Sequence, residues 1–105
     1  HGDGVRGFVR HAPVTLLTGR VIHPDLGDPR VGFYVEVDHH TWHDQSVAID
    51  TDNERDLQIR LVGGEVERVT NTRLAADLAR VVADIRHLYS RRIAQVGGES
   101  GRRPA

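Results

Sequence analysis

The segment from Val31 to Asp38 is the feature that most constrains the fold of this chain. It reads Val-Gly-Phe-Tyr-Val-Glu-Val-Asp. Its apolar side chains alternate onto both faces of a strand before the run ends in two carboxylates, so other parts of the chain need to cover both faces. The segment therefore predicts a central strand that carries Glu36 and Asp38 at its end.

Composition limits what surrounds this strand. A chain of 105 residues has room for one domain with one core. The net charge of -1 excludes the overall basic field of a histone-like DNA binder. With no Cys and no Lys, the chain has no thiolate zinc site and no Lys or Cys nucleophile. No apolar run approaches the roughly 20 residues of a membrane span, so we expect a cytoplasmic protein without membrane contact.

Elements on either side of the central strand follow from periodicity and turn residues. Residues 14–17 and 20–22 flank Thr18-Gly19 and predict a hairpin. Residues 25–29 contain Gly and Pro and predict a loop. The later residues predict three elements: a helix over 46–62 that ends at Gly63-Gly64, a strand over 65–70 and a long amphipathic helix from about Arg73 to Ala94.

This order of elements predicts an α/β fold with a small central mixed sheet flanked by helices. A strand, helix, strand unit places the strand over 65–70 beside the central strand. We expect a poorly structured lead-in over 1–13, a folded domain over 14–96 and a flexible tail over 97–105.

Carboxylates gather at the end of the central strand. Glu36 and Asp38 are two residues apart and point to one face, and Asp25 precedes them across a loop that can fold back beside them. Hard divalent cations such as Mg²⁺ or Mn²⁺ prefer these oxygen ligands. The alternative interpretation is an exposed acidic strand end.

Two further polar clusters follow the strand. Three imidazoles among His39, His40 and His43 can hold zinc, but adjacent histidines point to opposite sides of an extended segment. Single histidines acting as proton carriers or phosphate contacts fit this spacing better. Helical spacing puts a second set on one face, either as a solvated charge ladder or turned toward the carboxylates: Asp52, Arg55 and Asp56.

Five short motifs in this order carry a resemblance. They are Asp25-Leu-Gly-Asp28-Pro29, Val35-Glu36-Val37-Asp38, Trp42-His43, Asp52 with Arg55-Asp56, and Gly64 and Val66 with Arg68-Val69-Thr70. From about Val14 to Leu88 the chain resembles the small endonuclease domains related to very short patch repair endonucleases, in the PD-(D/E)XK restriction-endonuclease-like superfamily. The resemblance implies a restriction-endonuclease-like fold and Mg²⁺-dependent hydrolysis of DNA phosphodiester bonds, with DNA as partner.

The resemblance also implies roles for individual residues. Asp25 and Glu36 match the metal ligands, aided by a backbone carbonyl near Val37, and Asp38 matches the catalytic position two beyond the second ligand. His43 matches the histidine that activates or orients water. Three residues match helix positions that support the site or contact phosphate: Asp52, Arg55 and Asp56.

Two positions depart from the family pattern. Asp38 stands where the superfamily usually has Lys, and His39 stands where related domains carry Gly. They motivate a second hypothesis, a catalytically inactive nuclease-fold module that binds DNA or a protein partner. A histidine-based metal-binding protein is the third. Because the chain begins at His1, an upstream domain that recognises the target is a further expected partner, and the sequence leaves the oligomeric state open.

Overall fold

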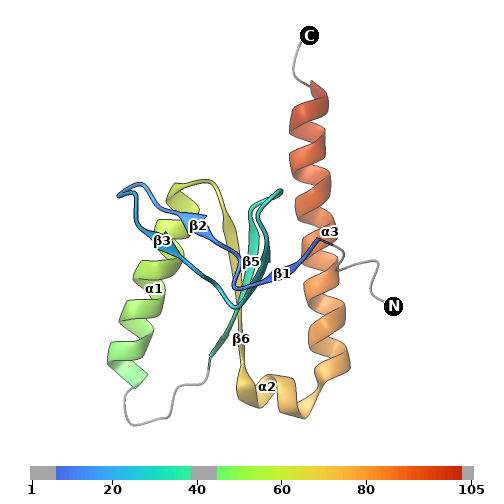
Figure 1. The fold of residues 1–105 in the computed structure, drawn as a ribbon. Coiled ribbons are helices and arrows are strands. Elements are labelled where there is room, and N and C mark those ends of the chain that lie inside the picture. Colours follow the sequence, from blue (N-terminus) through green and yellow to red (C-terminus); the bar gives the residue numbers. More distant parts are fainter. Residues whose placement is uncertain (1–6, 39–44, 103–105) are drawn as a thin grey trace.

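The computed structural model describes residues 7–38 and 45–102, and it shows a mixed α/β fold (Figure 1). The strands are β1 (Val9–Arg10), β2 (Val14–Thr15), β3 (Val21–Ile22), β4 (Leu26–Asp28), β5 (Phe33–Asp38) and β6 (Glu65–Thr70). The helices are α1 (Gln45–Leu61), α2 (Asn71–Ala76) and α3 (Leu78–Arg102). None of the helices in this part of the chain has the length and apolar character of a membrane span.

Four of the strands form one mixed sheet in the order β1-β4-β5-β6. The pairs β1–β4 and β4–β5 are antiparallel, and β5–β6 is parallel. The central strand is confirmed, because β5 has a neighbour on each side. Helix α1 connects β5 to its parallel neighbour β6, as the sequence predicts, and β2 and β3 pair as the predicted hairpin.

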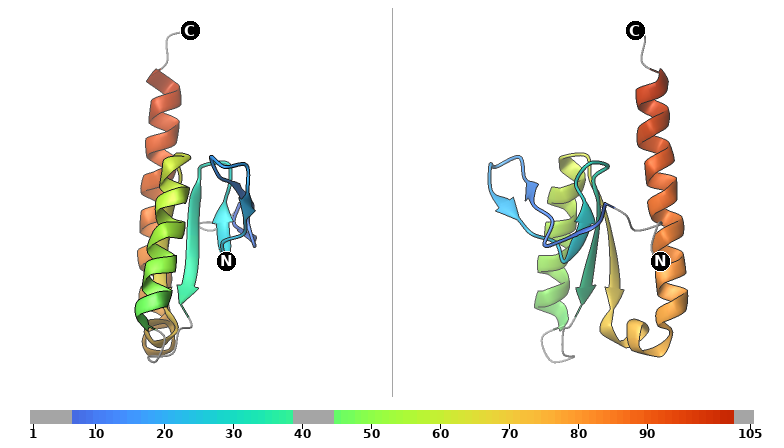
Figure 2. Two further views of the ribbon diagram at one scale, coloured as in Figure 1. Left: turned by 90° about the vertical axis from the view of Figure 1, so that its left-hand side faces the viewer. Right: turned by 45° about the vertical axis from the view of Figure 1, so that its right-hand side comes forward.

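Each face of the sheet carries its own core. Tyr34 points to a cluster formed with Ile59 of α1 and with hairpin residues such as Val14. Phe33 and Val35 point to the opposite cluster, which α2 and α3 complete. Figure 1 shows α1 and α3 on opposite sides of the sheet, and the second view in Figure 2 shows the β2–β3 hairpin beside α1. The alternation along β5 therefore predicts both covered faces correctly.

The loop expected over 25–29 is wrong, because residues 26–28 form β4. This short strand pairs on both sides, with β1 and with β5, so sheet hydrogen bonds outweigh its local turn residues. Gly27 is needed for packing here, since a Cβ atom at this position would clash with the Tyr34 ring. The strand β1 likewise lies within residues 1–13, which we expected to be poorly structured.

The single long helix expected from Arg73 to Ala94 is interrupted at Asp77. This residue has φ -156° and ψ 74°, and its side chain accepts a hydrogen bond of 3.1 Å from the Arg80 N–H. Asp77 thereby satisfies a free donor in the first turn of α3, as N-caps do. Residues 97–102, expected in the flexible tail, continue α3, because extending a formed helix fixes one residue for each added hydrogen bond.

Candidate functional site

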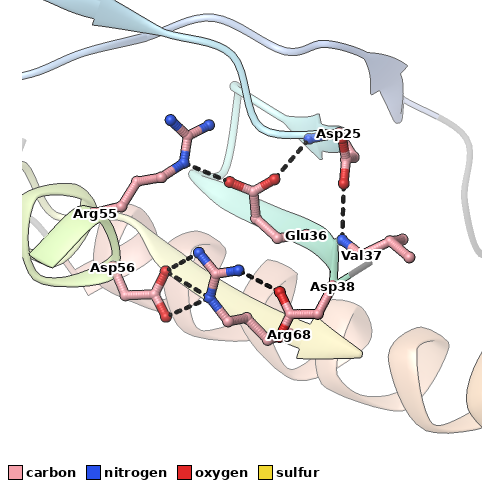
Figure 3. A network of polar contacts seen from close by, with 7 residues as sticks. All are labelled: Asp25, Glu36, Val37, Asp38, Arg55, Asp56 and Arg68. Atoms are coloured by element: carbon pink, nitrogen blue, oxygen red, sulfur yellow. Dashed lines mark hydrogen bonds and ion pairs between the residues drawn. The ribbon is translucent and has the colours of Figure 1, made fainter. Parts of the chain in front are cut away.

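Asp25 and Glu36 meet where β4 and β5 run side by side (Figure 3). The Asp25 N–H donates to Glu36 Oε1 at 3.2 Å, and Asp25 Oδ2 accepts from the Val37 N–H at 2.8 Å. Antiparallel pairing of the two strands makes this contact, because it places residue 26 opposite residue 35. The structure thus brings the first two predicted metal ligands together.

Arg55 balances the charge of Glu36. The Glu36 side chain is 9% exposed, and its Oε2 accepts a hydrogen bond of 2.7 Å from Arg55 Nε on α1. The other two guanidinium nitrogens of Arg55 turn away from Glu36 (Figure 3), and the side chain is 31% exposed. Arg55 therefore faces inward, as one of the two sequence interpretations expects, and keeps donors for an external anion.

Arg68 links Asp56 to Asp38. Its Nε lies 3.1 and 3.0 Å from the two Asp56 oxygens, its second terminal nitrogen lies 2.9 Å from Asp56 Oδ1, and its first lies 2.7 Å from Asp38 Oδ1. The bidentate contact with Asp56 fixes the plane of the guanidinium group. Arg68 consequently holds a positive charge beside Asp38.

Sequence reasoning did not give Arg68 a role, although a signal was present. Residues 65–70 alternate in polarity, and the predicted crossover places them beside β5. In the structure Arg68 is the direct partner of Glu36 in the parallel register. A polar residue on the same face as Glu36, one strand away, was therefore available to complete the site.

The three carboxylates do not converge on a single point. Within residues 7–38 and 45–102, no group of three or more Asp, Glu or His side chains is arranged to hold a metal ion. The Asp25 main-chain N–H donates to Glu36, whereas Asp38 forms an ion pair with Arg68. Asp52 lies on α1. Four residues singled out from the sequence lie outside the described residues: His39, His40, Trp42 and His43.

The carboxylate oxygens of Asp25 and Glu36 are suitable ligands for a hard cation. The two carboxylates supply oxygen only, which is the ligand type that Mg²⁺ and Mn²⁺ prefer. Hydrogen bonds engage Glu36 Oε1 and Oε2 and Asp25 Oδ2, but each carboxylate has about four lone-pair sites. The pair can therefore accept its present donors and still offer lone pairs to an ion.

Comparisons with known proteins do not assign the chain to a family. No protein-family model, curated protein or solved structure matches the chain. The function is consequently argued from the residues and contacts described above.

Proposed function

We propose that this chain is a metal-dependent endonuclease domain of restriction-endonuclease-like fold that hydrolyses DNA phosphodiester bonds. The observation that carries the proposal is the direct contact of Asp25 with Glu36 and Val37 at the end of β5. The Asp25 N–H donates to the Glu36 carboxylate, and the Asp25 carboxylate accepts from the Val37 N–H. Arg55 supplies a cationic side chain beside Glu36. A mixed sheet with helices on both faces is compatible with the proposed fold.

In this proposal Asp25, Glu36 and the Val37 carbonyl hold Mg²⁺ or Mn²⁺. When bound, the ion supplies a Lewis acid for the phosphate and lowers the pKa of a coordinated water. Arg55 stabilises the charge of Glu36 and directs its remaining donors toward a phosphate oxygen. His43 is proposed to orient the attacking water, in the role that the resemblance gives it.

Arg68 has a positioning role in the same proposal. Asp56 fixes its guanidinium group, and Arg68 in turn fixes Asp38. The positive charge of Arg68, which Asp56 shares, partly offsets the negative charge that Asp38 adds at this position. The polar chain from Asp56 to Asp38 supports the proposal, because it gives Asp38 a cationic partner at the position where the superfamily has Lys.

A second candidate is a catalytically inactive nuclease-fold module that binds DNA or a protein partner. The observation in its favour is that Glu36 and Asp38 already form short ion pairs, with Arg55 and Arg68. These pairs satisfy the carboxylates without an ion. Metal binding and strand cleavage measured separately distinguish the two candidates.

The test is isothermal titration of Mg²⁺ and Mn²⁺ into the metal-free protein, followed by nicking of supercoiled plasmid. We expect Asp25→Asn and Glu36→Gln to lose both metal binding and nicking. Asp84→Asn is the matched control, because Asp84 lies on α3 with its side chain 46% exposed, and it should keep both. Circular dichroism verifies that each variant is folded.

The outcomes separate the candidates. Full Mg²⁺-dependent nicking by Glu36→Gln would refute the proposed chemistry. A wild-type protein that binds DNA but shows no nicking with either ion supports the inactive module. Nicking that EDTA abolishes and that both site variants lose supports the endonuclease.

A further inference from the structure

A pocket opens beside Asp25, on the α3 side of the sheet. Its volume is about 430 Å³, within the range of about 300–1,000 Å³ typical of ligand sites. Leu26 and Leu74 form part of its apolar wall. Its polar lining comes from residues of three segments: Arg10, His11, Asp25 and Asn71.

Main-chain contacts hold the side of this pocket that Arg10 and His11 form. Arg10 is the register partner of Leu26 in the β1–β4 pair. The His11 N–H donates to the Asp25 carbonyl oxygen at 2.8 Å. Both residues are therefore held against the segment that carries the first proposed metal ligand. Among the described residues, no ion pair or side-chain hydrogen bond engages Arg10 or His11.

His11 has an unusual backbone conformation. Its φ is 51°, and among the described residues it is the one non-glycine with a positive φ. Left-handed conformations are uncommon for residues with a side chain and tend to occur at functional sites, where the surrounding structure enforces them. The conformation sets the direction in which the imidazole leaves the chain at the rim of the pocket.

We infer that this pocket binds one nucleotide of the DNA strand that is cut, adjacent to Asp25. Arg10 and His11 contact a backbone phosphate, and the sugar or base lies on Leu26 and Leu74. A nucleotide matches the lining, because it joins an anionic group to a flat apolar surface. The inference rests on the proposed function, since it takes the DNA strand to be the substrate of that site.

The test measures binding of the full chain to a fluorescein-labelled DNA duplex by anisotropy. Ca²⁺ replaces Mg²⁺, and a gel verifies that the DNA stays intact. The variants are Arg10→Gln and His11→Gly, because glycine adopts a positive φ without strain. Arg20→Gln is the matched control, since it removes one arginine charge from the exposed β2–β3 turn, outside the pocket.

We expect Arg10→Gln to weaken DNA binding about tenfold and to reduce the slope of log K against log salt by about 0.9, the value for one lost phosphate contact. His11→Gly should weaken binding several-fold, and Arg20→Gln should change it less than twofold. Equal effects of Arg10→Gln and Arg20→Gln, or no binding by the wild type, would overturn the inference.

The inference and the proposed function fail separately. Plasmid nicking by Glu36→Gln tests the chemistry and does not involve Arg10. If Arg10→Gln raises KM for DNA while Mg²⁺ affinity and kcat stay close to wild type, the pocket binds the strand. If Arg10→Gln loses Mg²⁺ affinity instead, Arg10 acts on the metal site and the inferred nucleotide contact is wrong.

Discussion

Asp25 and Asp28 lie three residues apart, yet the structure places them in opposite environments. Asp28 is fully buried and accepts hydrogen bonds from the Tyr89 hydroxyl at 2.5 Å and from Arg30 Nε at 3.0 Å. Asp25 is half-buried and lines an open pocket. A carboxylate enclosed by protein donors anchors the fold, whereas one that borders open space can bind a ligand.

The Asp28 end of the sheet secures helix α3. Tyr89 packs its ring edge-on against Phe8, with centroids 4.6 Å apart, while its hydroxyl reaches Asp28. One turn further along α3, Arg92 donates to the carbonyl oxygens of Val31 at 2.7 Å and Gly63 at 2.6 Å. These bonds connect the helix to the β4–β5 turn and to the turn after α1.

The largest expected effect is the loss of stability when the buried Asp28 is replaced, compared with the same replacement at Asp25. Asp28→Ala should lower the free energy of unfolding by about 3 kcal/mol, because it removes a buried acceptor of several hydrogen bonds. Asp25→Ala should cost about 1 kcal/mol, since water replaces its bond to Val37 at a half-exposed position. Urea denaturation measures both values.

Activity should show the reverse order. Under conditions where it is folded, Asp28→Ala should nick plasmid DNA at close to the wild-type rate, and Asp25→Ala should not nick it. Equal losses of stability in the two variants would show that the buried Asp28 contributes no more to the fold than the half-buried Asp25.

A smaller effect comes from the helix side of the same contact. Tyr89→Phe keeps the ring and removes the hydroxyl that donates to Asp28. We expect a loss of about 1.5 kcal/mol, the lower end of the range for a hydrogen bond to a charged group. In a double-mutant cycle with Asp28→Ala the two losses should not add. Simple additivity would mean that the hydroxyl stabilises the fold independently of Asp28.

The difference between the two ends also explains which parts of the structure the sequence could predict. The apolar run from Val31 to Asp38 predicts the central strand, and the position of Asp25 before it predicts the contact with Glu36, because both depend on local pattern and one strand pairing. The bond from Tyr89 to Asp28 joins residues 61 positions apart and leaves no periodic signal. Strand β4 was missed because Gly and Pro favour a turn locally, whereas two neighbouring strands supply its pairing.

The pH dependence of stability gives the next test of the buried end. Hydrogen bonds from Arg30 hold the pKa of Asp28 below its ordinary value of 3.8, against the opposing effect of burial. Ionised Asp28 therefore stabilises the fold fully above pH 3.8, and this contribution is lost as the pH falls through the lowered pKa. The urea midpoint of the wild type should fall over that interval relative to Asp28→Asn. Parallel curves for the two proteins would contradict the assignment.

The smallest expected effect on stability has the opposite sign. It distinguishes a pKa raised by burial from one lowered by hydrogen bonds. Burial raises the pKa of Glu67 on β6 above its ordinary value of 4.5, despite the attraction of Arg73. The folded state thus favours neutral Glu67. The contribution of neutral Glu67 to the free energy of unfolding is fully present below pH 4.5 and is lost as the pH rises through the raised pKa. Glu67→Gln should therefore stabilise the protein at pH 7 by about 0.5 kcal/mol and have little effect below pH 4.5. Urea midpoints at the two pH values measure the difference. Destabilisation at pH 7 would show that ionised Glu67 is held as Asp28 is, by favourable contacts that outweigh its burial.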